Sequence, residues 1–149
     1  MEYIVIKGHA EDNYKAIGLC ADALCNAGCV TEDFKNNCID REKNFPTGLP
    51  FEMPVAMPHS KSSAVNKDAI CLLILDKPVT FYRMDEETEK LDAKMVFNLA
   101  ITNPNGHIKV LQNLMKTFSS SGKLEDLYNS TEEEAQEKLK SFLSDSVAG

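Results

Sequence analysis

Two apolar runs, Ala69–Leu75 and Met95–Ile101, constrain the fold of this chain more than any other feature. Each has the length of a β-strand, and the chain reaches a proline soon after each of them. A strand that is apolar along nearly its whole length must be buried on both faces, as happens when helices cover both sides of a sheet. We therefore predict that both runs are interior strands of one sheet.

Shorter segments supply the other predicted strands. Pro54–Met57 is predicted to be a buried strand because its residues are small or branched, and Pro46 and Gly48 break the chain into a loop before it. Val79–Tyr82 is predicted to form a further short strand. The charged segment Asp85–Lys90 is expected to be a solvated loop.

Apolar residues at helical spacing predict two helices before these strands. The first carries its stripe from Ile17 to Ala27 and is expected to end at Gly28, a residue that suits the C′ position. The second is expected to begin at Thr31, a candidate N-cap, and to run toward Asn44.

Two more helices are predicted after the second apolar run. A stripe from Ile108 to Phe118 marks the first of them, and the segment Ser119–Gly122 stops it. The last helix is expected to begin with a capping box formed by Ser130 and Glu133.

The order of these elements indicates one α/β domain. The chain has 149 residues, 43% of them hydrophobic and 26% charged, which is enough for one substantial core. Strands interleave with helices, and no linker or internal repeat divides the chain. We predict a single domain over residues 1–149, with a mixed β-sheet covered by helices on both faces.

Charge and hydropathy argue against several kinds of partner. A net charge of −7 is unsuited to nucleic acid, which requires a basic surface. No stretch approaches the roughly 18 consecutive apolar residues of a membrane-spanning helix. The segment Met1–Lys7 has neither the basic start nor the long apolar core of a signal peptide. We therefore expect a cytoplasmic protein with no direct membrane insertion and no nucleic acid partner.

The cysteines predict neither a disulfide framework nor a zinc site. Their number is five, and an odd count without a secretion signal fits reduced thiols. Cys25 and Cys29 have the spacing of a metal pair, but they lie in a helical pattern and no second pair follows at zinc-site spacing. Small buried residues are the expected role, and no metal or cofactor is predicted.

His59 is the strongest candidate for chemistry because it directly follows Pro58 at the end of a predicted strand. Proline fixes its own backbone angle and donates no hydrogen bond, so the strand cannot continue as an ordinary central strand. A histidine on that stiff support can be a nucleophile, a proton carrier or a metal ligand. A lone histidine at a strand end more often only bonds to backbone, so the assignment depends on its neighbours.

Three further residues are expected near His59. His107 lies in the first turn of the helix that follows a strong strand, and strand ends and helix starts share one rim of an open α/β sheet. Thr47 and Arg41 are expected to offer a phosphoryl group a hydroxyl donor and a guanidinium. Each residue alone has an ordinary structural explanation. Their joint occurrence favours a phosphoryl site.

The segment between Arg41 and His59 strongly resembles the active-site segment of phosphotransferase-system (PTS) EIIA domains of the fructose/mannitol superfamily. The matching residues are Arg41-Glu42-x3-Pro46-Thr47-Gly48-Leu49 and Pro54-Val55-Ala56-Met57-Pro58-His59. Asn105-Gly106-His107-Ile108 is a weaker supporting signature, and Phe45-Pro46-Thr47-Gly48 is most similar to the galactitol branch.

This resemblance implies a cytoplasmic phosphocarrier, a phosphotransferase with the mannitol/fructose-type EIIA fold. His59 would take a phosphoryl group from the carrier protein HPr and pass it to a cysteine of an EIIB component. EIIB in turn works with the membrane component EIIC in uptake of galactitol or a related polyol or sugar. His107 would stabilise the phosphoryl oxygens, with Arg41 and Thr47 as outer support.

Two other functions stay open on the sequence alone. A regulatory module of the nitrogen-related EIIA type would share the fold and the histidine but signal by its phosphorylation state. A small metal-binding domain would use His59, His107 and a cysteine, although these histidines belong to no paired ligand spacing.

Overall fold

The computed structural model describes the backbone of residues 1–148, and their side chains except those of Pro104, Gly106, His107 and residues 144–148. Within this part of the chain the elements follow in the order β1 (Glu2–Gly8), α1 (Asn13–Asn26), α2 (Asp33–Asn44), β2 (Gly48–Leu49), β3 (Val55–Ala56), a 3-10 turn (Ser62–Ala64), β4 (Ala69–Tyr82), β5 (Lys90–Ala100), α3 (Pro104–Ser119), α4 (Lys123–Tyr128) and α5 (Glu132–Ala148).

The five strands form one mixed sheet in the order β1-β4-β5-β3-β2. β1 is parallel to β4, β4 is antiparallel to β5, β5 is parallel to β3, and β3 is antiparallel to β2. The predicted strands Ala69–Leu75 and Met95–Ile101 lie within or at the end of β4 and β5, and both elements are interior. The predicted α/β fold with a mixed sheet is confirmed.

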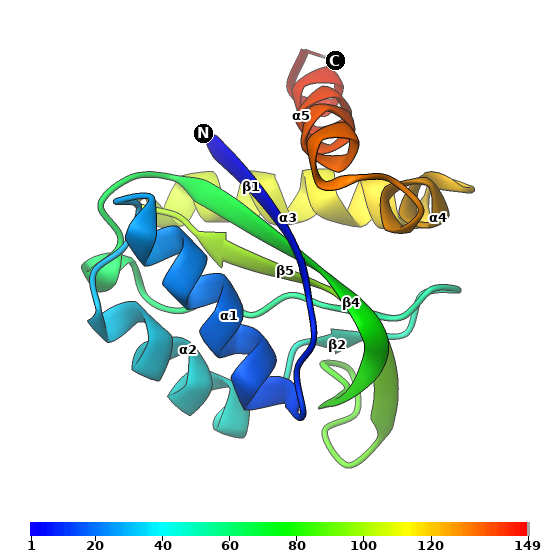
Figure 1. Cartoon of the computed structure of the whole chain (residues 1–149). Coiled ribbons are helices and arrows are strands. Elements are labelled where there is room, and N and C mark those ends of the chain that lie inside the picture. Colours follow the sequence, from blue (N-terminus) through cyan, green and yellow to red (C-terminus); the bar gives the residue numbers. More distant parts are fainter. Residues whose placement is uncertain (149) are drawn as a thin grey trace.

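Helices cover both faces of the sheet, which explains why β4 is apolar at consecutive positions. α1 and α2 lie on one face, and α3, α4 and α5 lie on the other (Figure 1). Leu73 and Leu75 of β4 pack in the core beneath α1 and α2, whereas Leu72 and Ile74 pack in the core beneath α3 and α5. Alternate side chains of a strand point to opposite faces, so each face of β4 requires its own apolar set.

Two predicted strands are in fact one. β4 continues from Ala69 to Tyr82, with an irregularity in its pairing between Ile74 and Val79. Pro78 lies in this irregular stretch, where its missing N–H leaves no gap in the ladder. Proline therefore interrupts the pairing without ending the strand.

The predicted helix ends are partly correct. α1 gives way to Gly28 at a φ of +78°, as expected for a C′ glycine. Thr31, however, provides no side-chain cap for α2, whose N-cap position is Glu32. The backbone N–H of Thr31 donates to the Ala64 carbonyl oxygen instead, at 2.9 Å.

The capping box of α5 lies one residue later than predicted. Thr131 and Glu134 bond reciprocally, each side chain accepting from the other residue's backbone N–H at 3.1 and 2.9 Å. The Ser130 hydroxyl instead donates to the Asp126 carbonyl oxygen of α4 at 2.6 Å. Ser130 therefore completes the preceding helix, and Ser130 with Glu133 is the wrong pair.

Gly48 is the tightest backbone approach near the site, and substitution there is expected to be costly. A Cβ at Gly48 would lie 2.5 Å from the Tyr82 carbonyl oxygen, whereas one at Gly8 would meet side-chain carbons at 3.5 Å or more. We expect Gly48→Ala to lower the free energy of unfolding by about 2 kcal/mol, because backbone must move. Gly8→Ala, the matched strand control, should change it little. Equal effects in chemical denaturation would contradict this assignment.

Candidate functional site

His59 lies just beyond the end of β3, at the edge of the sheet where β5 ends. The Pro58 carbonyl oxygen accepts a hydrogen bond from the Leu99 backbone N–H at 2.9 Å, which ties this segment to the last residues of β5. α3 begins shortly afterwards, with Asn103 as its N-cap. The end of β3, the end of β5 and the start of α3 therefore form one rim, as predicted.

A backbone hydrogen bond fixes the tautomer of the half-buried His59 ring. Its Nδ1 lies 2.9 Å from the Met57 carbonyl oxygen. A carbonyl oxygen can only accept, so Nδ1 must carry the proton. In the neutral ring the lone pair is then on Nε2, which is the nitrogen that can act as a nucleophile.

Asn98 supports the same segment from beneath, and its role was not predicted from the sequence. This fully buried β5 side chain donates from Nδ2 to the Pro58 carbonyl oxygen at 3.3 Å and lies 3.7 Å from the Cys38 sulfur. Burial raises the pKa of the Cys38 thiol to about 11, so this cysteine stays protonated near neutral pH. A protonated thiol is neither a nucleophile nor a metal ligand.

Thr47 is buried and is held by Glu42, a carboxylate of α2 that is only 5% exposed. Glu42 Oε2 accepts from the Thr47 backbone N–H and Oε1 accepts from the Thr47 hydroxyl, both at 2.8 Å. When Glu42 is ionised, the single hydroxyl hydrogen of Thr47 is used in this bond. Thr47 thus anchors the loop before β2, and its expected role as a donor to a phosphoryl group stays a prediction.

Arg41 lies on the His59 side of α2. Its Cζ is 5.0 Å from the centre of the exposed Phe45 ring, and it lines a pocket of about 410 Å³ together with Ser60 and Lys61, which directly follow His59. Its Nε is buried and has no hydrogen-bond partner among the described residues. A guanidinium and an ammonium group therefore lie next to the histidine segment, together with one carboxylate, that of Asp40. The two cations can bind a negatively charged group there.

His107 occupies the first turns of α3, at the rim that holds His59. The Asn103 side chain caps this helix by accepting from the Asn105 backbone N–H at 2.9 Å. The His107 side chain is outside the described residues, so its position relative to the His59 ring stays a prediction.

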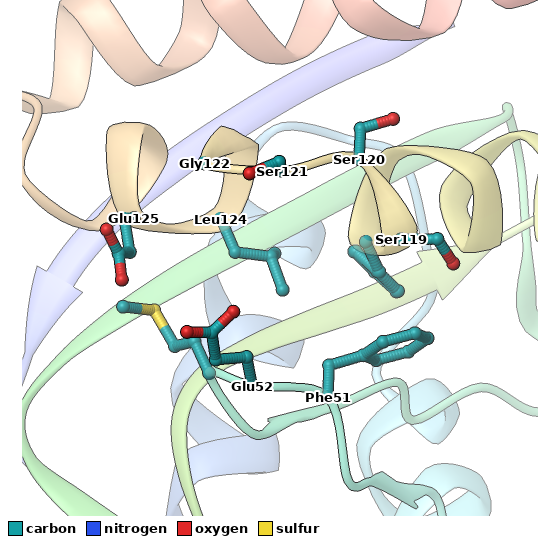
Figure 2. A pocket seen from close by; sticks show the side chains of 10 residues that line it. Phe51, Glu52, Ser119, Ser120, Ser121, Gly122, Leu124 and Glu125 are labelled. Atoms are coloured by element: carbon teal, nitrogen blue, oxygen red, sulfur yellow. The ribbon is translucent and has the colours of Figure 1, made fainter.

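Another hollow lies at the far end of α3. Figure 2 shows a pocket of about 280 Å³ between Phe51 and Glu52 on one side and Leu124 and Glu125 on the other. It adjoins the C-terminal end of α3, one helix length or about 24 Å from the start of that helix. The described residues contain no group of three His, Cys, Asp or Glu side chains arranged to hold a metal ion.

The third histidine, His9, lies at the opposite end of the sheet. It follows the last pair of β1 with β4, Gly8 opposite Leu75, and its ring nitrogens contact Asp76 and Glu11 at 3.0 Å. The His9 pKa is raised by the hydrogen bonds to Glu11 and Asp76. His9 is therefore an exposed ion-pairing residue and a useful control for His59.

Glu42 should make the stability of the protein depend on pH. Burial raises its pKa from 4.5 to about 7, against the opposing effects of the Thr47 bonds and the nearby Arg41. The folded state then holds this proton more tightly than the unfolded state, so stability falls as pH rises from 4.5 to 7. Relative to Glu42→Gln, the wild type should lose about 3 kcal/mol of unfolding free energy over that range.

Chemical denaturation of both proteins at a series of pH values measures this difference. Titrating groups that both proteins share, such as His9, cancel in this difference. A difference in unfolding free energy that is constant between pH 4.5 and 7 would show that Glu42 does not carry this titration.

Comparisons with known proteins identify the family and the fold of this chain. A family model described as "Phosphoenolpyruvate-dependent sugar phosphotransferase system, EIIA 2" matches residues 1–141. The crystal structure of IIA mannitol from Escherichia coli is 24% identical, with a TM-score of 0.73 over 95% of each chain. No described helix is long and apolar enough to span a bilayer.

Two further solved structures share the fold. One is the complex of enzyme IIA-Mtl with phosphorylated enzyme IIB-Mtl from E. coli, 22% identical, with a TM-score of 0.73 over 96% of this chain and 94% of that chain. The other is the nitrogen regulatory protein IIA-Ntr from Neisseria meningitidis, 23% identical, with a TM-score of 0.73 over 94% of this chain and 92% of that one.

Proposed function

Because the chain belongs to the EIIA 2 family of the phosphoenolpyruvate-dependent sugar phosphotransferase system, we propose that it is a phosphocarrier whose phosphorylated residue is His59. In this proposal His59 receives the phosphoryl group from phosphorylated HPr and passes it to a cysteine of an EIIB component. The observation that carries the assignment is the bond from His59 Nδ1 to the Met57 carbonyl oxygen, which leaves the lone pair on Nε2.

The transfer consists of two displacements at phosphorus. In the first, His59 Nε2 forms a bond to phosphorus as the bond to the HPr histidine breaks, and that histidine leaves with the electron pair. In the second, a cysteine thiolate of EIIB forms the new bond and His59 recovers its lone pair. The proton on Nδ1 stays in its bond to Met57 throughout, so the transfer mainly requires in-line positioning and donors for the equatorial oxygens.

Positive groups around His59 supply those donors. Arg41 lines the pocket beside Ser60, and its guanidinium can hold two phosphoryl oxygens at once. His107 supports the same oxygens from the start of α3, where backbone N–H groups and the helix dipole also favour negative charge. Thr47 acts indirectly by fixing the loop that leads to β2.

The EIIB partner and the transported compound form the finer part of the proposal. A solved complex of a IIA mannitol protein with phosphorylated IIB supports an EIIB partner, which would act with a membrane EIIC. The segment Phe45–Gly48 favours a transport system of the galactitol type, of which this chain would be a cytoplasmic component. The second candidate is a regulatory module, favoured by the similarity of fold to IIA-Ntr.

One reconstituted reaction tests the proposal. The purified chain is incubated with phosphoenolpyruvate, enzyme I and HPr, and then with EIIB proteins of the galactitol and mannitol types. We expect one acid-labile phosphoryl group per chain, followed by its transfer to a cysteine of EIIB. Phosphorylation without transfer to any EIIB would favour the regulatory module, and absence of phosphorylation would contradict both.

A further inference from the structure

Glu42 is a buried carboxylate at the end of the apolar stripe of α2. Phe34, Cys38 and Glu42 are spaced four residues apart, so they share one face of the helix, and all three are buried. A carboxylate in such a position requires hydrogen bonds to offset the loss of water. Thr47 supplies two, from its backbone N–H and its hydroxyl, each 2.8 Å long.

A continuous series of hydrogen bonds leads from Glu42 to His59. Glu42 holds both donors of Thr47, and the Thr47 carbonyl oxygen accepts from the Met57 backbone N–H at 3.2 Å. The Met57 carbonyl oxygen in turn accepts from His59 Nδ1 at 2.9 Å. The residue that anchors Thr47 is therefore connected, through the backbone of Thr47 and Met57, to the carbonyl group that orients the imidazole.

Only short strand pairing holds the backbone near this series, so its position depends on these hydrogen bonds. β2 and β3 pair over only two residues each, Gly48 with Ala56 and Leu49 with Val55. Without the Glu42 carboxylate, two donors of a buried residue would lose their acceptor, and the loop would shift to satisfy them. A shift of the loop moves Met57 and with it the acceptor of His59 Nδ1.

We propose that Glu42 is a positioning residue for phosphoryl transfer, which sets the tautomer and orientation of His59 through Thr47 and Met57. The inference rests on the proposed function of His59. Glu42 makes no described contact with the His59 ring, so it acts through other residues and is not itself catalytic. Protonation leaves the mechanism intact, since the Thr47 hydroxyl can accept from a carboxylic acid as well as donate to a carboxylate.

The test compares Glu42→Gln and Glu42→Ala with the wild type in two measurements. Nitrogen-15 NMR of labelled histidine reports which ring nitrogen of His59 carries the proton, with no partner protein needed. Stopped reactions with phosphorylated HPr give the rate of phosphoryl acceptance. We expect His59 in Glu42→Ala to populate both tautomers. This variant should also accept the phosphoryl group about ten- to hundredfold more slowly than the wild type. Glu42→Gln keeps an acceptor for Thr47, so its tautomer population and its rate should lie between those of the wild type and Glu42→Ala.

Phe34→Leu is the matched control for a purely structural effect. Phe34 is buried on the same face of α2. Phe34→Leu should therefore destabilise the fold without altering the His59 tautomer or the rate of phosphoryl acceptance. Thr47→Val replaces only the hydroxyl of Thr47 with a methyl group. The double variant Glu42→Ala/Thr47→Val should accept the phosphoryl group no more slowly than Glu42→Ala alone, because both changes act on one series of hydrogen bonds.

Wild-type tautomer and rate in a folded Glu42→Gln or Thr47→Val protein would overturn the inference. So would a change in tautomer in Phe34→Leu equal to that in the Glu42 variants. If the wild type itself accepts no phosphate from HPr, the proposed function fails, whereas the tautomer measurement still decides whether Glu42 orients His59.

Discussion

His59→Ala is expected to abolish phosphoryl acceptance from HPr altogether. The Nε2 lone pair of His59 forms the new bond in the proposed transfer, and alanine offers no replacement nucleophile. Incubation with radiolabelled phosphoenolpyruvate, enzyme I and HPr measures the number of phosphoryl groups bound per chain, which should fall from one in the wild type to none in this variant.

His9→Ala is the matched control for this experiment. It removes an imidazole from the opposite end of the sheet, where the ring only contacts Asp76 and Glu11. His9→Ala should accept phosphate at the wild-type rate. Normal labelling of His59→Ala, at normal rate and stoichiometry, would show that another residue carries the phosphoryl group.

The second largest effect is expected for His107→Ala, which should still be labelled on His59, but slowly. Loss of one positioned donor typically costs on the order of 2–4 kcal/mol of transition-state stabilisation, or about two to three decades in rate. The onward transfer to EIIB should be slowed as well, since the same oxygens require support in both steps. Rapid mixing with phosphorylated HPr measures the first step, and labelled EIIB the second.

A wild-type transfer rate in His107→Ala would refute the pairing of His107 with His59. The final stoichiometry separates this role from that of a carrier, because a supporting residue changes how fast the label arrives and not where it resides. Unfolding of the variant by denaturant checks that its fold is intact.

The main features of the fold could be predicted from the sequence because the interior strands are apolar on both faces. Ala69–Leu75 can only be an interior strand or a buried helix. Its short length and the proline that soon follows favour the strand, which the structure confirms. β1 (Glu2–Gly8) was not identified, because an edge strand of mixed polarity has a weak pattern. β2 contains two residues, which is too short for any periodicity, whereas β3 lies within the predicted strand Pro54–Met57.

The candidate site could be predicted from the sequence only where adjacent residues combine a reactive side chain with a restricted backbone. Pro58-His59 gives a stiff support and a reactive ring in adjacent positions, and Arg41 is near them in the sequence. Asn98 and Glu42 act through contacts that no local pattern reports. A signal was nevertheless present in both cases, since each is a polar residue within an apolar strand or on an apolar helix stripe. A buried polar residue of this kind requires a partner.

The Thr47 hydroxyl shows why residue type alone gives an incomplete account of a residue's contacts. Threonine beside a glycine in a loop before the site is a reasonable donor to phosphate. In the structure this hydroxyl donates to the carboxylate of Glu42, five residues earlier. No sequence pattern predicts that contact. Likewise Ser130 and Thr131 are both acceptable N-caps, and only the contact of Ser130 with α4 decides between them.

The central claim is that His59 carries the phosphoryl group on Nε2 while Nδ1 keeps its bond to Met57. NMR of the phosphorylated wild-type chain, with nitrogen-15 in its histidines, tests this directly through one-bond coupling between phosphorus and nitrogen. The account predicts coupling to a single nitrogen, Nε2 of His59, with a proton retained on Nδ1. Coupling to Nδ1 of His59, to a nitrogen of His107, or to no histidine at all would contradict it.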